Sequence, residues 1–276
     1  IRMVSIWILS TENLQRPPEE VAGLVQLIEN RLRDAARDPK THRKRMRIRA
    51  IGKLEISAQT CDELADYAAD LLEVLASLTP ALQAQSQLKI VTNGGGMNPL
   101  ACVQQAAKSL VAAGLSDIKI GAVWGDDLLG RIDSLRQAGC EFKNLDTGEP
   151  ISQLTEPIVS ANAYLGAQPI AAALAEGARI VITGRVADAS LTVGPAVHEF
   201  GWRWDDWARL AAASVAGHVI ECGAQATGGF SPFWNQLDLG HVGYPIAELE
   251  RDGSVTITKP PGTGGVINRH TVAEQL

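Results

Sequence analysis

The densest group of residues that could bind a ligand or move a proton is one polar turn, in which Thr183, Gly184 and Arg185 are followed by Asp188. The turn follows residues 180–182, a β-branched run typical of a strand covered on both faces of a parallel sheet. Ligands of open α/β sheets bind at the carboxyl ends of strands, where loops and helix N-termini surround a crevice. Arg185 is therefore the first candidate for holding an anion, and Thr183 is a candidate beside it. A structural alternative stays open, because Arg185 and Asp188 could pair with each other while Asp188 caps the next helix.

A second cluster follows another predicted strand, over residues 88–91. The turn Thr92-Asn93-Gly94-Gly95-Gly96-Met97-Asn98 leads into Pro99, which suits the first position of a helix. Consecutive glycines let the backbone approach a ligand, and the helix start offers N–H groups to a phosphate or carboxylate. Asn93, the three glycines and Asn98 are therefore candidates for substrate contacts. Asn98 could also cap the helix, and the segment could be a tight turn without a ligand. Its spacing differs from G-x-G-x-x-G, which disfavours nicotinamide binding.

Further candidates lie on either side of the polar turn. Asn162 lies in a loop upstream of it, and we count it among the substrate-binding residues. His218 and Glu221 are three positions apart in a helix predicted over residues 210–226, so they share one face and could form an acid/base pair or help to bind a metal. A histidine satisfied within a helix interface is the alternative. Together with Asp188, these two residues are the catalytic candidates.

Two other turns carry charge. Asp126 and Asp127 follow a strand predicted over residues 118–123, and adjacent carboxylates could hold a metal or act in acid/base chemistry. Adjacent residues point in different directions, however, and an N-cap by one of them, before a helix over residues 128–137, is the more common arrangement. Lys259 stands beside a glycine-rich loop that could supply a phosphate contact or serve only as a rigid connection.

Composition limits the class of protein. The chain has 276 residues, of which 46% are hydrophobic and 20% charged, so it can bury a sizeable core. Its net charge of −6 argues against nucleic acid as a partner. Four cysteines without a C-x-x-C pair favour reduced, mostly buried thiols in a cytoplasmic protein and give no zinc signature. No apolar run approaches the roughly 18 to 20 residues of a membrane span. We expect a small-molecule substrate and no stable membrane insertion, and a homo-oligomer stays open.

The beginning of the chain, VSIWILSTENLQRPPEEV followed by MRIRAIGKLE, resembles the middle of a cis-prenyltransferase of the undecaprenyl diphosphate synthase family. The Ser-x-Glu-Asn-x-x-Arg-Pro loop of that family maps onto Asn13 and Arg16, and the resemblance implies that these residues assist diphosphate departure and isopentenyl diphosphate binding. Leu14 replaces the usual Trp. The resemblance covers about residues 1–55, without the family's Met-Asp-Gly-Asn-x-Arg, Tyr-Gly-Gly-Arg and Arg-x-Ser-Gly-x-x-Arg motifs. Mg²⁺ is implied only under this alternative.

A larger part of the chain, from about residue 70 to residue 276, resembles the acyclic terpene utilisation protein A family. The matching segments occur in the expected order: TNGGGMNP, GDDLL, NLDTGEP, SANAYLGAQPIAAALAEGARIVITGRVADASLTVGPAVHEFGW, DDWARLAAASVAGHVIECGAQATGG, VGYPIAE and KPPGTGG. The resemblance implies a role in bacterial degradation of citronellol-like and geraniol-like terpenoids through coenzyme A thioesters. It assigns neither a reaction nor catalytic residues.

We therefore expect an α/β fold, a layered and mostly parallel sheet with helices on both faces, truncated at both ends. Residues 1–60 would be a cis-prenyltransferase-like βαβ fragment, and residues 61–276 a partial terpene-utilisation domain. The leading hypothesis is a protein that binds an acyl-coenzyme A thioester or a related anionic metabolite, and any enzyme activity would be that of a lyase or hydratase. Prenyl diphosphate binding or transfer, and an inactive truncated fusion, are the alternatives.

Overall fold

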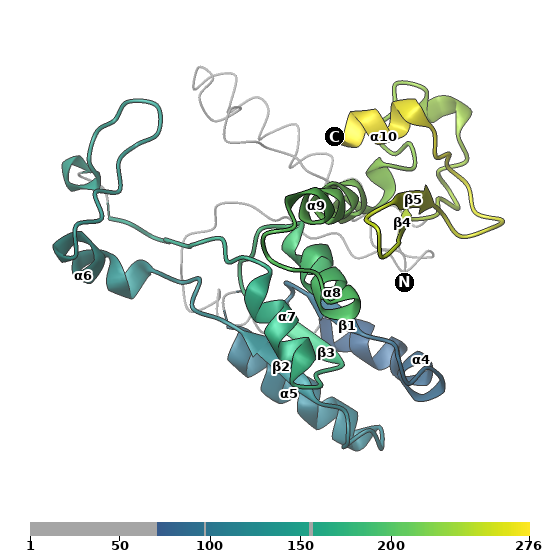
Figure 1. Ribbon diagram of the computed structural model, residues 1–276, viewed down its shortest axis with the longest axis horizontal. Helices are drawn as coiled ribbons and strands as arrows, with labels where there is room; N and C mark the ends of the chain where they lie inside the picture. Colours follow the sequence, from purple (N-terminus) through teal and green to yellow (C-terminus); the bar gives the residue numbers. More distant parts are fainter. Residues whose placement is uncertain (1–70, 97, 155–156) are drawn as a thin grey trace, which may run out of the picture. The chain divides into compact units, whose positions relative to one another are not determined.

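The computed structural model describes residues 71–96, 98–154 and 157–276. The chain divides into two compact units, Ile1–Cys61 and Asp62–Leu276, and all described residues belong to the second. Asn13, Arg16 and the βαβ fragment predicted over residues 1–60 lie outside the described part, so the boundary between the two predicted segments stays a prediction. The described part contains a parallel sheet, an antiparallel pair of strands and helices, which confirms the predicted α/β class (Figure 1).

The centre of this unit is a three-stranded parallel sheet in the order β1-β3-β2. Its strands are β1 (Ile90–Thr92), β2 (Ile120–Val123) and β3 (Ile180–Thr183). Every residue of β3 is buried, because β3 pairs with a strand on each side and carries apolar side chains on both faces. The β-branched run expected to form a doubly covered strand does so.

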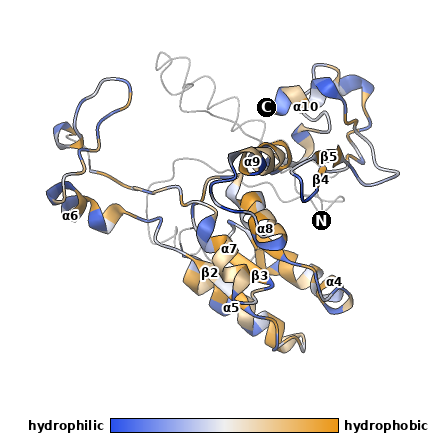
Figure 2. Ribbon diagram, viewed as in Figure 1, coloured by the Kyte–Doolittle hydropathy of each residue, from blue (hydrophilic) through white to orange (hydrophobic). Residues whose placement is uncertain are grey.

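The two faces of β3 pack against different helices. Ile180 and Ile182 join a buried cluster that includes α5 (Pro99–Ala112), whereas Val181 joins a cluster that includes α7 (Gln168–Ala175). Successive side chains of a strand point to opposite faces, so the predicted arrangement with helices on both faces is confirmed. Figure 2 shows that α7 is largely hydrophobic, as a helix packed on a sheet requires.

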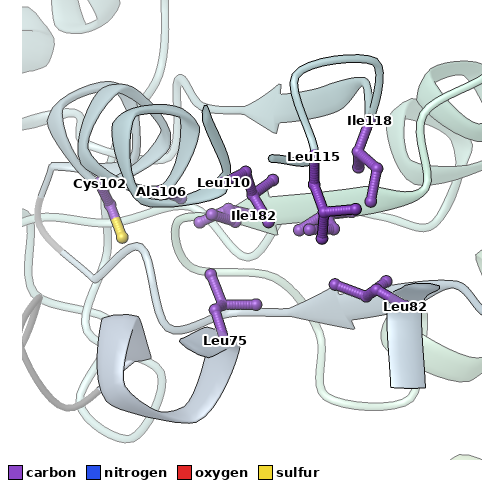
Figure 3. Close-up of a cluster of buried hydrophobic side chains, with 9 residues drawn as sticks. Leu75, Leu82, Cys102, Ala106, Leu110, Leu115, Ile118 and Ile182 are labelled. Atoms are coloured by element: carbon purple, nitrogen blue, oxygen red, sulfur yellow. The ribbon is translucent and has the colours of Figure 1, made fainter. Parts of the chain in front are cut away.

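Helix α5 begins and packs as its sequence predicts. The Asn98 side chain accepts a hydrogen bond from the Ala101 N–H at 3.1 Å, so it caps the helix in front of Pro99. The buried residues after this cap recur every fourth position, at Cys102, Ala106 and Leu110. Figure 3 shows these three side chains opposite Leu75 and Leu82, with Ile182 between the two groups.

The crossovers of the sheet explain why the helices lie on opposite faces. The chain passes from β1 through α5 to β2, and then returns through α7 to β3, which lies between the first two strands. Because parallel crossovers are right-handed, a reversal of direction moves the connecting helix to the other face. Helix α8 (Ser190–Phe200), which follows β3, packs on α7, so the chain leaves β1 and β3 towards opposite faces. Such a switch point opens a crevice at the carboxyl ends of the strands.

The remaining elements extend from this core. A second layer contains α9, which packs on α8 and against the antiparallel pair β4 and β5. The bounds of the other elements are α4 (Thr79–Ala84), η2 (Leu129–Arg131), α6 (Ile132–Gln137), η3 (Ile151–Gln153), α9 (Trp207–Glu221), η4 (Gly223–Gln225), η5 (Trp234–Gln236), β4 (Ile246–Leu249), β5 (Val255–Thr258) and α10 (Arg269–Gln275).

Two predicted helices have other bounds in the structure, and the helix expected over residues 210–226 begins earlier, at Trp207. The helix expected over residues 128–137 starts as the 3₁₀ turn η2 and becomes α-helical only at Ile132. The helix expected over residues 210–226 ends at Glu221, because Gly223 takes a left-handed conformation with φ of 56° and a 3₁₀ turn follows.

The cysteines correct one expectation. Cys102 is buried, but Cys140 and Cys222 are exposed, so the prediction of mostly buried thiols is wrong for two of the three described cysteines. Cys140 follows Gly139 in the loop after α6, and Cys222 ends α9, and neither position faces a core. In the part of the chain that the structure describes, every helix is too short or too polar to cross a membrane.

The amino end of β3 is held by an arginine. Arg179 donates from Nε to the Leu88 carbonyl at 3.3 Å and from Nη2 to the carbonyls of Leu82 and Gln85 at 3.0 and 2.7 Å. Leu82 and Gln85 lie at the end of α4, where backbone carbonyls lack partners within the helix. One guanidinium therefore joins α4, β1 and β3.

We predict that Arg179→Met lowers the free energy of unfolding by about 2 to 3 kcal/mol, since methionine keeps the apolar stem but leaves three carbonyls without their donor. Urea denaturation followed by circular dichroism measures the change. Lys108→Met, on an exposed position of α5, is the control and should have little effect. An equal loss in both variants would show that the contacts of Arg179 do not stabilise the unit.

Candidate functional site at the carboxyl edge of the sheet

The carboxyl ends of the three parallel strands bring together turns that are far apart in sequence. Thr92 and Val123 end the outer strands, and Thr183 ends the central strand. The Gly95 N–H donates to the Thr183 carbonyl at 3.2 Å, and the Gly184 N–H donates to the Val123 carbonyl at 3.0 Å. The glycine-rich turn and the polar turn after β3, identified separately in the sequence, therefore meet at one edge.

The glycine-rich turn uses its own backbone donors. The Gly94 N–H donates to Thr92 Oγ1 at 3.1 Å, and the Gly96 N–H donates to the Asn93 carbonyl at 3.3 Å. With the bond from Gly95 to β3, all three glycine N–H groups have partners within the protein. These bonds account for a tight turn, in which Asn93, Gly96 and Asn98 are exposed and Asn98 is engaged as the cap of α5.

The sequence did not distinguish Asp126 from Asp127, and the structure shows that Asp126 is the buried carboxylate of this edge. Asp126 is 4% exposed, and its Oδ2 accepts hydrogen bonds from the Arg185 N–H at 2.8 Å and from Asn162 Nδ2 at 3.2 Å. Asp127 points elsewhere, because its Oδ1 accepts the Leu129 N–H at 2.9 Å at the start of η2. A carboxylate removed from water needs such donors, so Asp126 fixes the backbone of Arg185 and the side chain of Asn162.

Residues 161–165 link the exits of β2 and β3. Residues 161–163 pair with residues 126–128 through two backbone bonds of 2.7 Å. Leu165 pairs with the turn after β3, donating to the Arg185 carbonyl at 3.2 Å and accepting from the Ala187 N–H at 2.9 Å. This segment, which we name the strap, places Asn162 beside Asp126.

The side chain of Arg185 points out of this bonded framework. Its guanidinium carbon lies 5.6 Å from the ring centroid of Tyr164, a cation–π arrangement, and both residues are exposed. Among the described residues, no acidic side chain forms an ion pair with Arg185. Thr183, by contrast, is buried and donates its hydroxyl hydrogen to the Gly184 carbonyl at 2.9 Å. The edge therefore presents the exposed guanidinium of Arg185, a residue whose backbone is held by Asp126.

The structural alternative for Asp188 does not occur. Asp188 does not pair with Arg185, and α8 begins at Ser190 after Ala189, its N-cap residue, without a side-chain cap. Asp188 lies instead near the end of α9. The pKa of the Cys222 thiol is raised above its ordinary value, first by desolvation and then by the carboxylates of Glu221 and Asp188. The exposed carboxylates of Asp188 and Glu221 therefore both contribute to the raised pKa of this thiol, and they lie in its vicinity.

The histidine candidate is engaged with another helix. His218 Nε2 lies 2.9 Å from the Gln275 backbone oxygen, and Gln275 Nε2 donates to the His218 carbonyl at 2.7 Å. This reciprocal contact joins α9 to α10, and it is the helix-interface arrangement that the sequence left open. Within residues 71–96, 98–154 and 157–276, no group of three or more His, Cys, Asp or Glu is placed to hold a metal ion.

The loop beside Lys259 is held together by that lysine. Lys259 Nζ donates to the Thr263 carbonyl at 2.6 Å and to Thr263 Oγ1 at 3.3 Å. The Thr263 hydroxyl in turn donates to the Pro260 carbonyl at 2.6 Å. These bonds favour the rigid connection over the phosphate contact.

Comparison with known proteins identifies the family. A family model described as "Acyclic terpene utilisation family protein AtuA" matches residues 44–276. The chain belongs to this family. The larger of the two resemblances is thereby confirmed, and the match begins earlier in the chain than residue 70. The carboxyl edge described above lies entirely within the matched residues.

A shorter similarity joins the chain to prenyl transferases. Its relatives include the tritrans,polycis-undecaprenyl-diphosphate synthase (geranylgeranyl-diphosphate specific) of Methanocaldococcus jannaschii, 37% identical over 68 residues, which are 25% of this chain and 24% of the relative. The isoprenyl transferase of Deinococcus radiodurans is 45% identical over 53 residues, 19% of each chain. The chain thus spans at most about a quarter of the length of these two relatives. No solved structure matches the chain.

We predict that Gly184→Ala loosens the carboxyl edge. A Cβ atom at Gly184 would lie 2.2 Å from Asp126 Oδ1, so the carboxylate would have to leave its position beside the Arg185 N–H. We expect a loss of about 1 to 3 kcal/mol in the free energy of unfolding, measured by urea denaturation. Gly130→Ala is the matched control, since its Cβ would meet no atom within 4 Å. Similar stability of the two variants would contradict the close approach of Asp126.

Proposed function

We propose that the carboxyl edge of the β1-β3-β2 sheet binds an anionic acyclic terpenoid metabolite, a coenzyme A thioester or a related acid, through Arg185. The main support is the exposed guanidinium at the end of the central strand, stacked on Tyr164 and paired with no described carboxylate. The backbone of Arg185 is held in place because its N–H donates a hydrogen bond to the buried carboxylate of Asp126. Membership in the acyclic terpene utilisation family supports a terpenoid ligand.

We propose further that the ligand undergoes a lyase or hydratase reaction at this edge, in a cytoplasmic protein. A thioester carbonyl acidifies the adjacent carbon, and a carboxylate in reach takes that proton while a second acid protonates the departing hydroxyl. Asp188, in the turn after β3, and Glu221, at the end of α9, are exposed carboxylates. Both contribute to the raised pKa of the Cys222 thiol, so they lie in the same region. His218 could join them only by giving up its contact with the Gln275 carbonyl.

We expect Arg185→Ala to weaken binding of the ligand by about 1 to 3 kcal/mol, because a charge-assisted hydrogen bond is lost. Isothermal titration calorimetry with coenzyme A thioesters of short acyclic terpenoid acids, and with the acids themselves, measures the change. Lys108→Ala removes a positive charge from an exposed position of α5 and should leave the affinity unchanged. Unaltered affinity in Arg185→Ala would remove Arg185 from the site.

A second candidate function rests on the similarity to prenyl transferases. One relative is named an undecaprenyl-diphosphate synthase specific for geranylgeranyl diphosphate, and the other is named an isoprenyl transferase. The resembling loop of this chain contains Asn13 and Arg16. This candidate predicts Mg²⁺-dependent binding of isopentenyl or farnesyl diphosphate, reduced at least about tenfold in Arg16→Ala because a charged partner of the diphosphate is lost. The same calorimeter measures it with and without Mg²⁺. If neither terpenoid thioesters and acids nor prenyl diphosphates bind, the inactive fusion is the better account.

A further inference from the structure

We infer that the ligand group held by Arg185 is a carboxylate and not a phosphate. The inference rests on the proposed function, because it takes the carboxyl edge as the ligand site. It goes further by selecting the acid group of an acyclic terpenoid ligand over the phosphates of a coenzyme A thioester or prenyl phosphate. Three features of the edge support it: its charges, its hydrogen-bond donors and its aromatic surface.

The charges at the edge suit a single negative charge. Arg185 is the cation of the turns that follow the three strands in the described part of the chain, whereas Asp126, Asp127 and Asp188 are anions of the same turns. A phosphate monoester brings close to two negative charges to one guanidinium and meets these carboxylates as well. A carboxylate brings one charge, which the guanidinium balances. Phosphoryl sites depend on several positive groups acting together, and the described edge has one.

Seven backbone N–H groups at this edge are bonded within the protein. The N–H groups of residues 190–192, at the start of α8, donate to the carbonyls of residues 187–189 at 2.7, 3.3 and 3.0 Å. The N–H groups of Gly94, Gly95 and Gly96 are also bonded within the protein. The Arg185 N–H donates to Asp126. A helix start or glycine loop binds phosphate only through free N–H groups, so these seven groups are not available to a phosphate. The guanidinium side chain is the charged donor that remains.

The aromatic surface beside Arg185 suits the rest of an acyclic acid. The guanidinium fork forms two parallel hydrogen bonds with a carboxylate or a phosphate alike, and its carbon lies 5.6 Å from the centroid of the Tyr164 ring. Tyr164 is 65% exposed, and Trp124, the residue after β2, is 59% exposed. These two aromatic residues offer apolar surface at the edge, where the hydrocarbon chain of an acyclic acid could pack.

The test compares three probes that share the same acyclic terpenoid chain and differ only in the end group, which is a carboxylate, a hydroxyl or a phosphate. Calorimetric titration of the whole chain should show that the acid binds at least about tenfold more tightly than the alcohol or the monophosphate. Arg185→Ala should bring the acid to the affinity of the alcohol. Arg185→Lys should weaken binding of the acid but keep its preference over the phosphate, because an ammonium group keeps the single positive charge and lacks the planar fork. Lys108→Ala should behave as the unaltered protein.

The outcomes separate this inference from the proposed function. If the monophosphate binds as tightly as the acid, and Arg185→Ala weakens both, the edge is the ligand site but the inference is wrong. If Arg185→Lys loses the preference for the acid, the single positive charge is not what selects the carboxylate, and the inference is wrong. If none of the three probes binds, and the coenzyme A thioesters do not bind either, the proposed function and the inference fail together.

Discussion

The buried carboxylate of Asp126 is the contact on which the carboxyl edge depends. It lies after β2, and it accepts hydrogen bonds from the backbone of the turn after β3 and from Asn162 of the strap. Hydrogen bonds to a charged acceptor contribute about 1.5 to 3 kcal/mol each, and the same carboxylate without its donors would be costly to bury. The contact requires a glycine at position 184, since any side chain there would occupy the place of the carboxylate. One acidic residue thus fixes two strand exits and the strap.

The two arginines that flank β3 show what this constraint leaves available for function. Arg179, before the strand, donates to three carbonyls and joins α4 to the sheet. Arg185, after the strand, has its backbone bonded and its guanidinium exposed over Tyr164. Only the second can meet a ligand without loss of structural contacts. This asymmetry agrees with the rule that the carboxyl ends of parallel strands carry the sites of α/β proteins.

Much of the described fold follows from local sequence. The β-branched run before Thr183 gives the central strand, and Asn98 with Pro99 gives the start of α5. Parallel pairing then places the glycine-rich turn beside the polar turn. Contacts between residues far apart in sequence could not be predicted in this way. The bond from the Arg185 N–H to Asp126 depends on strand order, and the contact between His218 and Gln275 depends on helix packing. From sequence alone, an acidic residue after a strand, such as Asp126, is equally well interpreted as a helix cap.

The same long-range contacts decide the chemistry of the edge. From the sequence, three consecutive glycines before a helix suggest a phosphate site, because the sequence does not show that their N–H groups have partners within the protein. In the folded unit, the Gly95 N–H is bonded to the strand that lies between β1 and β2, so the order of the sheet itself removes that donor. What remains is one guanidinium above a buried carboxylate, beside aromatic surface. A ligand with one negative charge and a long apolar chain would match this combination better than a polyanion. This is why we propose an acyclic terpenoid acid as the ligand of this member of the acyclic terpene utilisation family.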